Sequence, residues 1–475
     1  TEGNNVIVNN FKLLKIATLY CLNSTIPIQS ILALFKDKLQ LYIQFSFSLL
    51  SENPVISTYA SNQRDWILNN LPKFIDCVNS WDELKNYPID FGRAYFLCSY
   101  STDSNRHNIK ESIHALFRRI KISKDLDEIH IKNSALGKNY PDKKERKNIL
   151  VIHERFYSNH AVYRCLSNFF GILSEKHNVF GVCFQKEHID DIAKSFFKSH
   201  YILDSQAIFD SFCNLSRIIK DNQIDIIYYP SIGMTMETII CSSFKLAPKI
   251  VCTLAHPSPS LNKTTDCVIS YTGLVESERD PYTKYKLLQR THPMRLVFED
   301  YKCPDNWQIL EKKQHSYPLK IAITATPQKI TAQFIAIVRK ISDIYTDSIE
   351  FIFHDASGNT TTQNHLQIYL DQNLSSNVIV KSRLSYDKYL LSLKECIICL
   401  SPYPFGNHNG FLDCTLSGII GPSLITGTIP QNTERLYYDL CGLQDLITSN
   451  DEDYIKVISS LIDVGLGRKE SSIYL

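Results

Sequence analysis

Short, almost wholly apolar segments alternate with amphipathic segments along the chain from about residue 147 onward. They form two series: NILVIH, VFGVCF, IDIIYYP, KIVCTLAH and DCVISY, then LKIAITAT, IEFIFHD, NVIVKS, CIICLSP and PSLITG. Continuous apolar strands separated by helices are typical of parallel sheets that are covered on both faces. The pattern predicts two doubly wound α/β units in tandem, facing one another across a cleft. Such sheets bind ligands outside the carboxyl ends of their strands.

The segment before these strands has a different pattern. Its apolar residues recur at spacings of three and four, and no alternating strand pattern competes with them. The residues that carry this spacing are Ile28, Ile31, Leu32, Phe35 and Leu39. They predict an α-helical layer over residues 1 to about 90. A further helix is expected from about 110 to 122, where the apolar residues share one face.

Together these patterns predict an α/β chain with three parts. An α-helical N-terminal domain is expected over 1–98, a first Rossmann-like domain over 99–295 and a second over 296–475. With 475 residues, the chain has the length of two to three domains that can each bury a core.

Composition and charge restrict the expected partners. The net charge of +2 gives no reason to expect nucleic acid or an anionic membrane as a partner. The apolar stretch from Leu13 to Phe35 is interrupted by polar residues and lacks a basic start, so neither a secretory signal nor a membrane span is expected. The 14 cysteines lack framework spacing and are typical of free thiols in a reducing compartment. We therefore expect a soluble, cytoplasmic protein.

Polar residues gather after the predicted strand CIICLSP. The loop contains Asn407, Asn409 and Gly410, and a helix expected from about Gly410 carries Asp413 in its first turn. Gly and Asn permit tight turns, and the positive end of a helix dipole suits a diphosphate. Asp413 would then accept hydrogen bonds from ribose hydroxyls. An Asn-rich turn with an Asp near a helix N-terminus explains these residues equally well.

Two further clusters follow other predicted strands. Thr326 and Lys329 come after LKIAITAT, where a hydroxyl and a lysine can neutralise a departing phosphate. An exposed lysine beside a helix-capping threonine is the alternative. His160, after NILVIH, and His256, in KIVCTLAHP, can orient a sugar or an acceptor, or move a proton. Histidines in such loops more commonly serve as caps or as hydrogen-bonding partners in the core.

Several motifs resemble those of a known family, and they occur in the same order. The motifs are CSYSTDSNRHNIKESIHALFRR, FYSNHAVYR, YYPSIGMTMETIICSSFKLAP, LAHP, TATPQK and PYPFGNHNGFLD. They are similar to motifs of the bacterial cytoplasmic N-glycosyltransferases that modify high-molecular-weight adhesins, a family related to the eukaryotic O-GlcNAc transferases. The resemblance, from about 94 to 465, implies a GT-B fold: two facing Rossmann-like domains preceded by an α-helical domain. It also implies an inverting transfer of a hexose, with glucose expected, from a UDP-sugar to a protein.

The resemblance assigns the donor to residues after two strands of the second unit: Thr326, Lys329, Asn407, Asn409, Gly410 and Asp413. Of these, Thr326 and Lys329 match positions that hold the donor phosphates. Asn409 and Asp413 match residues around the diphosphate and the ribose. The two remaining residues shape the loop.

No metal or other cofactor is expected. The family resemblance implies a metal-free transfer. Sugar-nucleotide enzymes that use a divalent ion typically carry Asp-x-Asp after a strand, whereas DLD at 125–127 and DED at 451–453 fall in polar, helical stretches. Cys396 and Cys399 form a CxxC without a second pair, and a buried strand explains both residues.

The acceptor side departs from the family pattern. His160 and His256 match histidines of the family's active-site cleft, and together with Lys329 they are the candidate catalytic residues. Arg93, Leu97 and Arg383 stand where the family has other residues. The family implies asparagine in Asn-x-Ser/Thr as the acceptor. The departures leave open a Ser/Thr hydroxyl or a protein-linked sugar as acceptor, or a weakly active UDP-sugar-binding subunit that acts with a partner glycosyltransferase chain.

Overall fold

The structure is a computed structural model of the chain. It describes residues 13–15, 18, 27–35, 37–52, 57–84, 86–87, 89–136, 145–204, 208–253, 256–271, 286–290, 317–355, 358–425 and 429–470. The chain divides into two compact units. The first consists of Thr1–Ser51, Gln63–Ser99 and Asp103–Lys302, and the second of Glu52–Asn62, Tyr100–Thr102 and Cys303–Leu475.

The first unit contains a parallel sheet in which the described strands have the order β3-β2-β1-β4-β5-β6-β7. This is the Rossmann order with one strand added at the end. The strands are β1 (Asn148–Ile152), β2 (Asn178–Cys183), β3 (Ser199–Ile202), β4 (Ile226–Tyr229), β5 (Lys249–Cys252), β6 (Cys267–Tyr271) and β7 (Lys286–Arg290). All five segments of the first predicted series lie in this sheet, so that prediction is confirmed.

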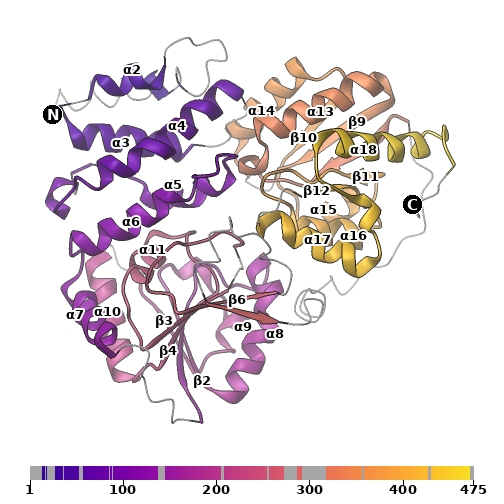
Figure 1. Cartoon of the computed structure of the whole chain (residues 1–475). Coiled ribbons are helices and arrows are strands. Elements are labelled where there is room, and N and C mark those ends of the chain that lie inside the picture. Colours follow the sequence, from indigo (N-terminus) through magenta and orange to yellow (C-terminus); the bar gives the residue numbers. More distant parts are fainter. Residues whose placement is uncertain are drawn as a thin grey trace. The chain divides into compact units, whose positions relative to one another are not determined.

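Helices cover both faces of this sheet, with α8 and α9 on one side and α7 and α10 on the other (Figure 1). The helices and the 3₁₀ turn that accompany the sheet are α7 (Lys124–Leu136), α8 (Ala161–Lys176), η3 (Lys186–His188), α9 (Asp191–Lys194), α10 (Ile208–Asp221) and α11 (Met236–Ser242). Because both faces are covered, strand residues such as Leu150, Val151 and Ile152 are fully buried.

Where the structure describes it, the N-terminal part is helical, as predicted; residues 1–12, 16–17, 19–26 and 53–56 of the predicted layer lie outside the described residues. Its elements are α2 (Ile28–Ala33), α3 (Leu39–Leu50), α4 (Thr58–Ile75), η1 (Trp81–Glu83), α5 (Phe91–Leu97), η2 (Cys98–Tyr100) and α6 (Asn108–Arg119). The helix expected from about 110 to 122 is α6. Within the first unit, α5 and α6 are joined to the loop after β5: the Tyr95 hydroxyl donates to the Ser260 carbonyl at 2.7 Å, and Lys110 Nζ donates to the Pro259 carbonyl at 2.9 Å.

The second unit contains a parallel sheet of order β10-β9-β8-β11 and a separate parallel pair, β12 and β13. The strands are β8 (Leu319–Ile323), β9 (Ile349–His354), β10 (Asn377–Lys381), β11 (Ile398–Cys399), β12 (Ser423–Leu424) and β13 (Ile447–Thr448). The second predicted series is thereby confirmed. Gly421 lets the chain pass close to β11, since a Cβ there would lie 1.8 Å from the Cys399 carbonyl oxygen.

In Figure 1, α13 and α14 lie on one side of this sheet and α15, α16 and α17 on the other. The helical elements are η5 (Pro327–Lys329), α13 (Ala332–Tyr345), η6 (Thr346–Ser348), α14 (Thr360–Asn373), α15 (Tyr386–Leu393), α16 (His408–Leu416), α17 (Ile429–Cys441), η7 (Gln444–Leu446) and α18 (Asp451–Gly465). The predicted domain limits at 98 and 295 stay predictions: the first falls at η2, and the second lies outside the described residues.

Three strands were not predicted, and each lacks a continuous apolar run. β3 is the edge strand SHYI, and β7 is the edge strand KLLQR. β13 is only two residues long. An edge strand needs no apolar covering on both faces, so its sequence carries a weaker signal than that of a central strand.

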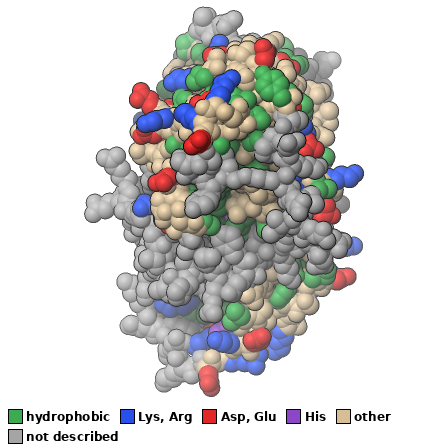
Figure 2. Space-filling model, turned by 90° about the vertical axis from the view of Figure 1, so that its right-hand side faces the viewer, with side chains coloured by type: hydrophobic (Ala, Val, Ile, Leu, Met, Phe, Trp, Pro, Cys, Tyr) green, Lys and Arg blue, Asp and Glu red, His purple; other side chains and the backbone are tan. Residues whose placement is uncertain are grey.

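On the face shown in Figure 2, basic and acidic side chains are interspersed, in keeping with the small net charge. Among the helices that the structure describes, none combines the length and the apolar character that a bilayer crossing requires.

A buried carboxylate organises the strand ends of the first unit. Glu154 follows β1 with one residue between them and is 1% exposed. Its Oε1 accepts hydrogen bonds from the backbone N–H groups of Gly233, Met234 and Thr235, at 2.6 to 3.0 Å, and from the Thr238 hydroxyl. Its Oε2 accepts from the Ser231 hydroxyl at 2.7 Å. The carboxylate thus fixes the turn between β4 and α11.

Glu154→Ala should lower the free energy of unfolding by about 2–4 kcal/mol, because several buried donors lose their acceptor. Chemical denaturation followed by circular dichroism measures this loss. Glu175→Ala, at an exposed position of α8, is the matched control and should change stability by less than about 0.5 kcal/mol. Equal effects of the two substitutions would contradict the role of Glu154.

Candidate active site

The carboxyl ends of β8 and β11 bring Lys329 and the 401–410 loop together. Lys329 lies at the end of η5, and its Nζ donates a hydrogen bond to the Gly406 carbonyl at 2.9 Å. The same ammonium group lies 5.3 Å from the centre of the Phe405 ring. Burial lowers the pKa of Lys329 to about 8, and the negative charge of Glu434 opposes this shift. The cation is therefore held at the loop that leads into α16.

Asn407 connects the two loops and begins α16. Its Nδ2 donates to the Thr324 hydroxyl, and its side chain makes no capping hydrogen bond to the helix. Gly410 makes this arrangement possible, because a Cβ at that position would lie 2.3 to 2.5 Å from side-chain atoms of Asn407. The N-terminal end of α16 is thus left uncapped by Asn407, and the positive end of its dipole is directed at the loop that also holds Lys329.

A second buried glutamate holds this loop in place. Glu434, in α17, is 1% exposed and accepts hydrogen bonds from the Ser401 hydroxyl at 2.5 Å, the Asn407 backbone N–H and the Ser423 hydroxyl. Burial raises the pKa of this carboxyl, and the hydrogen bonds and the Lys329 charge oppose the rise. Sequence reasoning missed Glu434, because it lies in a helix far along the chain from the loop and belongs to no recognised motif.

Asp413 lies elsewhere than expected. α16 begins at His408, so Asp413 falls in the second turn of the helix, and the expectation of the first turn was wrong. The residue is 5% exposed, and its Oδ1 accepts a hydrogen bond of 2.6 Å from the Tyr386 hydroxyl. Tyr386 is a further residue that sequence reasoning did not assign to the site.

Two further residues that were expected to bind the UDP-sugar, Thr326 and Asn409, also lie near the carboxyl ends of β8 and β11. Thr326 precedes η5, and its Oγ1 is buried without a hydrogen-bond partner among the residues that the structure describes. A buried hydroxyl without a partner is uncommon in folded proteins and is compatible with a ligand contact. Asn409 lies in the first turn of α16 and is half-buried.

The candidate histidines of the first unit follow β1 and β5. His160 is the N-cap of α8, and its Nδ1 accepts a hydrogen bond from the Val162 backbone N–H at 3.2 Å. His256 lies with its ring centre 4.8 Å from that of Phe96 in α5. Both histidines are half-buried. The capping interpretation of His160 is thus realised, and its Nε2 is the ring nitrogen that the cap does not use.

Arg93 and Leu97, two of the residues that differ from the family pattern, have different surroundings. Arg93 lies in α5, and its Nε donates to the Ser51 carbonyl at the end of α3. Leu97, also in α5, is 1% exposed. Leu97 therefore belongs to the core of the first unit.

The Asp-x-Asp segments are helical, as expected from the sequence. DLD at 125–127 lies in α7, and DED at 451–453 forms the first turn of α18. Cys396 and Cys399 are both buried, as expected. Only Cys399 lies in β11, and Cys396 precedes the strand, so the buried-strand interpretation of the CxxC segment is confirmed for Cys399 alone.

Comparison with solved structures identifies the fold. The fold matches a mutant of the O-GlcNAc transferase of Thermobaculum terrenum with a TM-score of 0.59 at 12% identity, over 97% of this chain and 93% of that one. Two Rossmann-like sheets preceded by helices are the GT-B fold of glycosyltransferases, and the predicted fold class is confirmed.

Sequence comparison gives the relatives. Residues 33–120 match the family described as HMW1 domain 2. Two UDP-glucose:protein N-beta-glucosyltransferases of Actinobacillus pleuropneumoniae, from serotypes 5b (strain L20) and 7 (strain AP76), are 24% and 23% identical over 87% of this chain. The chain spans 65% of the length of these relatives. It is therefore related to the N-glycosyltransferase family indicated by its motifs, and that prediction is confirmed.

Gly410→Ala should destabilise the second unit by about 1–3 kcal/mol, because the new methyl group must displace Asn407 from its hydrogen bond to Thr324. Thermal and denaturant unfolding measure the change. Thr415→Ala, at an exposed position of the same helix, is the control. If Gly410→Ala is as stable as the control, the close approach of Asn407 to α16 is not a constraint on the loop.

Proposed function

We propose that the chain is an inverting, metal-independent glycosyltransferase. It transfers a hexose, glucose in the first instance, from a UDP-sugar to the asparagine of Asn-x-Ser/Thr in a protein acceptor. The observation that carries the proposal is that the Lys329 ammonium group binds the loop that leads into α16, whose N-terminus has no side-chain cap from Asn407. The chain is also related to UDP-glucose:protein N-glucosyltransferases. Two sources of positive charge on adjacent strand-end loops suit a diphosphate.

The leaving group is the part of the reaction that these residues would serve. As the bond between the anomeric carbon and the UDP oxygen breaks, negative charge collects on the β-phosphate. Lys329 and the α16 N-terminus stabilise that charge without a metal, and the buried hydroxyl of Thr326 gains an acceptor in the phosphate. Glu434 and Gly410 keep these groups in place before the donor binds.

The acceptor nitrogen attacks the anomeric carbon from the face opposite to UDP, so the configuration inverts, and the nitrogen loses one proton. An amide nitrogen is a weak nucleophile. Orientation of the acceptor and stabilisation of the leaving group therefore contribute more than a strong base. His160 and His256 are the residues proposed to orient the acceptor.

The first test is UDP release from UDP-glucose in EDTA, with and without an Asn-x-Thr peptide, followed by mass spectrometry of the peptide. Peptide-dependent release and glucose on asparagine are expected. Lys329→Ala should reduce turnover by a factor of about 10–100. Lys340→Ala, at an exposed position of α13, should leave it unchanged. Glucose on Ser or Thr, or an absolute need for added metal, would overturn the corresponding part of the proposal.

The affinity for UDP should fall as the pH rises through about 8, because Lys329 loses its proton there and the phosphates lose a cationic partner. Well above that pH the loss approaches a factor of about ten per pH unit. Calorimetric titration of UDP between pH 6.5 and 9.5, a range chosen to span this pKa by about 1.5 units on either side, measures the effect. In Lys329→Ala the affinity should be lower and independent of pH over this range. A wild-type affinity that stays constant would exclude Lys329 as the phosphate partner.

A further inference from the structure

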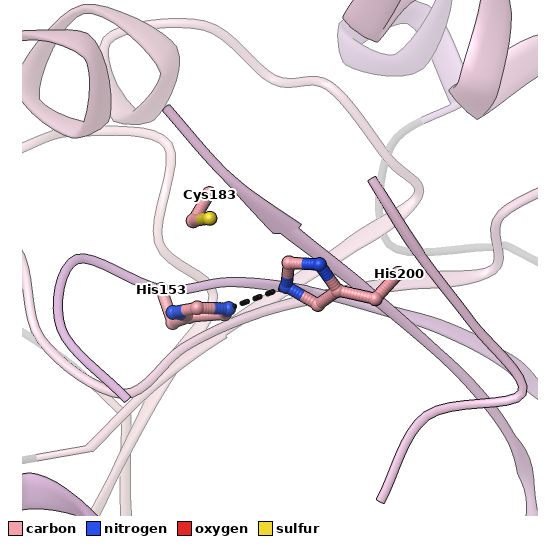
Figure 3. A group of neighbouring side chains, drawn as sticks. All are labelled: His153, Cys183 and His200. Atoms are coloured by element: carbon pink, nitrogen blue, oxygen red, sulfur yellow. Dashed lines mark hydrogen bonds between the residues drawn. The ribbon is translucent and has the colours of Figure 1, made fainter. Parts of the chain in front are cut away.

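Three side chains with metal-binding atoms meet at the edge of the first sheet. His153 directly follows β1, Cys183 ends β2 and His200 is in β3, so three neighbouring parallel strands supply them. Their ligand atoms lie within 4.8 Å of one another. Figure 3 shows the two imidazole rings joined by a hydrogen bond, 2.8 Å between the two Nε2 atoms, with the Cys183 thiol beside them.

The arrangement is held by its surroundings. The His153 ring stacks on Phe197, with ring centres 5.9 Å apart and planes within 8°. Gly181 leaves room for the other ring, because a Cβ there would lie 2.3 Å from His200 Cδ2. The backbone N–H of His153 donates to the Val182 carbonyl at 3.0 Å, which fixes the strand ends to each other. Packing and register together preset the positions of all three side chains.

The types of ligand atom and their burial suit a cation of intermediate softness. Two imidazoles and one thiolate are preferred ligands of Zn²⁺, and three protein ligands leave a fourth position for water. His153 and Cys183 are 1% and 0% exposed, whereas His200 is half-buried on the edge strand and gives an ion a route from solvent.

The geometry points to a Zn²⁺ site formed by His153, Cys183 and His200 in the first unit. In the metal-free protein the same residues form a hydrogen-bonded histidine pair next to a thiol. Ligand nitrogens around a tetrahedral zinc are about 3.3 Å apart, so the pair must open by about 0.5 Å for the ion to enter. Side-chain rotation supplies a movement of this size without a change in the strands.

Binding exchanges protons for metal bonds. The Cys183 thiol loses its proton to solvent as the bond between zinc and sulfur forms. The histidine that donates in the pair moves its proton from Nε2 to Nδ1, and both Nε2 atoms bind the ion. Both Nδ1 atoms are buried without a hydrogen-bond partner among the described residues, so the hydrogen bond that this tautomer gives up is the one between the two rings, and the bonds to the ion replace it. No oxidant or reductant is needed.

The site would brace the loop that leads to α8. This loop starts at His153 and ends at His160, the N-cap of α8. It is also tied to the segment after β2 by the Ser158 hydroxyl, which donates to Asp190 Oδ2 at 2.6 Å. The ion would add a further connection between β1 and its neighbours at the same end of the sheet. This proposal does not depend on the proposed sugar transfer.

The test uses the full chain without a polyhistidine tag, stripped with a chelator and then titrated with Zn²⁺ and, separately, with Co²⁺. About one equivalent of each ion should bind, and bound Co²⁺ should show the charge-transfer absorption of a cobalt–thiolate bond. Cys183→Ser should abolish that absorption, and His200→Gln should weaken zinc binding by a factor of at least about ten. Cys252→Ser, at a buried cysteine of β5 in the same sheet, should bind like the wild type.

Circular dichroism and thermal unfolding establish that each variant is folded. The proposal is overturned if the folded wild-type chain binds no stoichiometric zinc. It is overturned equally if cobalt binds without the thiolate absorption, or if Cys183→Ser and His200→Gln bind as tightly as Cys252→Ser.

Discussion

Each unit depends on one buried glutamate that accepts hydrogen bonds from, and so orients, the amide and hydroxyl groups at the carboxyl ends of its strands. Glu154 follows β1 and accepts the amide groups of the turn between β4 and α11. Glu434 projects from α17 and accepts from the loop after β11 and from β12. Strand-end loops carry the ligand-binding groups of doubly wound folds, and they have few backbone partners of their own. A buried carboxylate with several donors gives such loops a fixed shape.

Lys329 and the 401–410 loop show what that fixed shape achieves. Lys329 is partly buried, yet its ammonium group contacts a carbonyl and the face of an aromatic ring, and the negative charge of the buried Glu434 acts on it. In the proposed function, a cation held in this way is available to a phosphate of the donor. The same burial brings its pKa close to neutral pH, so the positive charge is available but easily lost.

Much of the fold could be predicted, because central parallel strands must be apolar on both faces. NILVIH, VFGVCF and CIICLSP identify β1, β2 and β11 for this reason, whereas the edge strands β3 and β7 carry no such requirement. The candidate site was predictable where a motif places residues near one another along the chain, as for Asn407 and Gly410. Glu434 and Tyr386 contact the same loops from distant positions, and no local pattern marks them.

The sequence by itself determined the two α/β units, the helical N-terminal part, the family relationship and the strand-end loops that carry the candidate residues. These follow from hydrophobic periodicity and from short motifs, which are local properties of the chain. The tertiary structure decided which distant side chains meet. It placed Asp413 in the second turn of α16 beside Tyr386, and it brought His153, Cys183 and His200 from three strands to one point. Such meetings depend on strand order and register, which fix contacts between residues far apart in sequence.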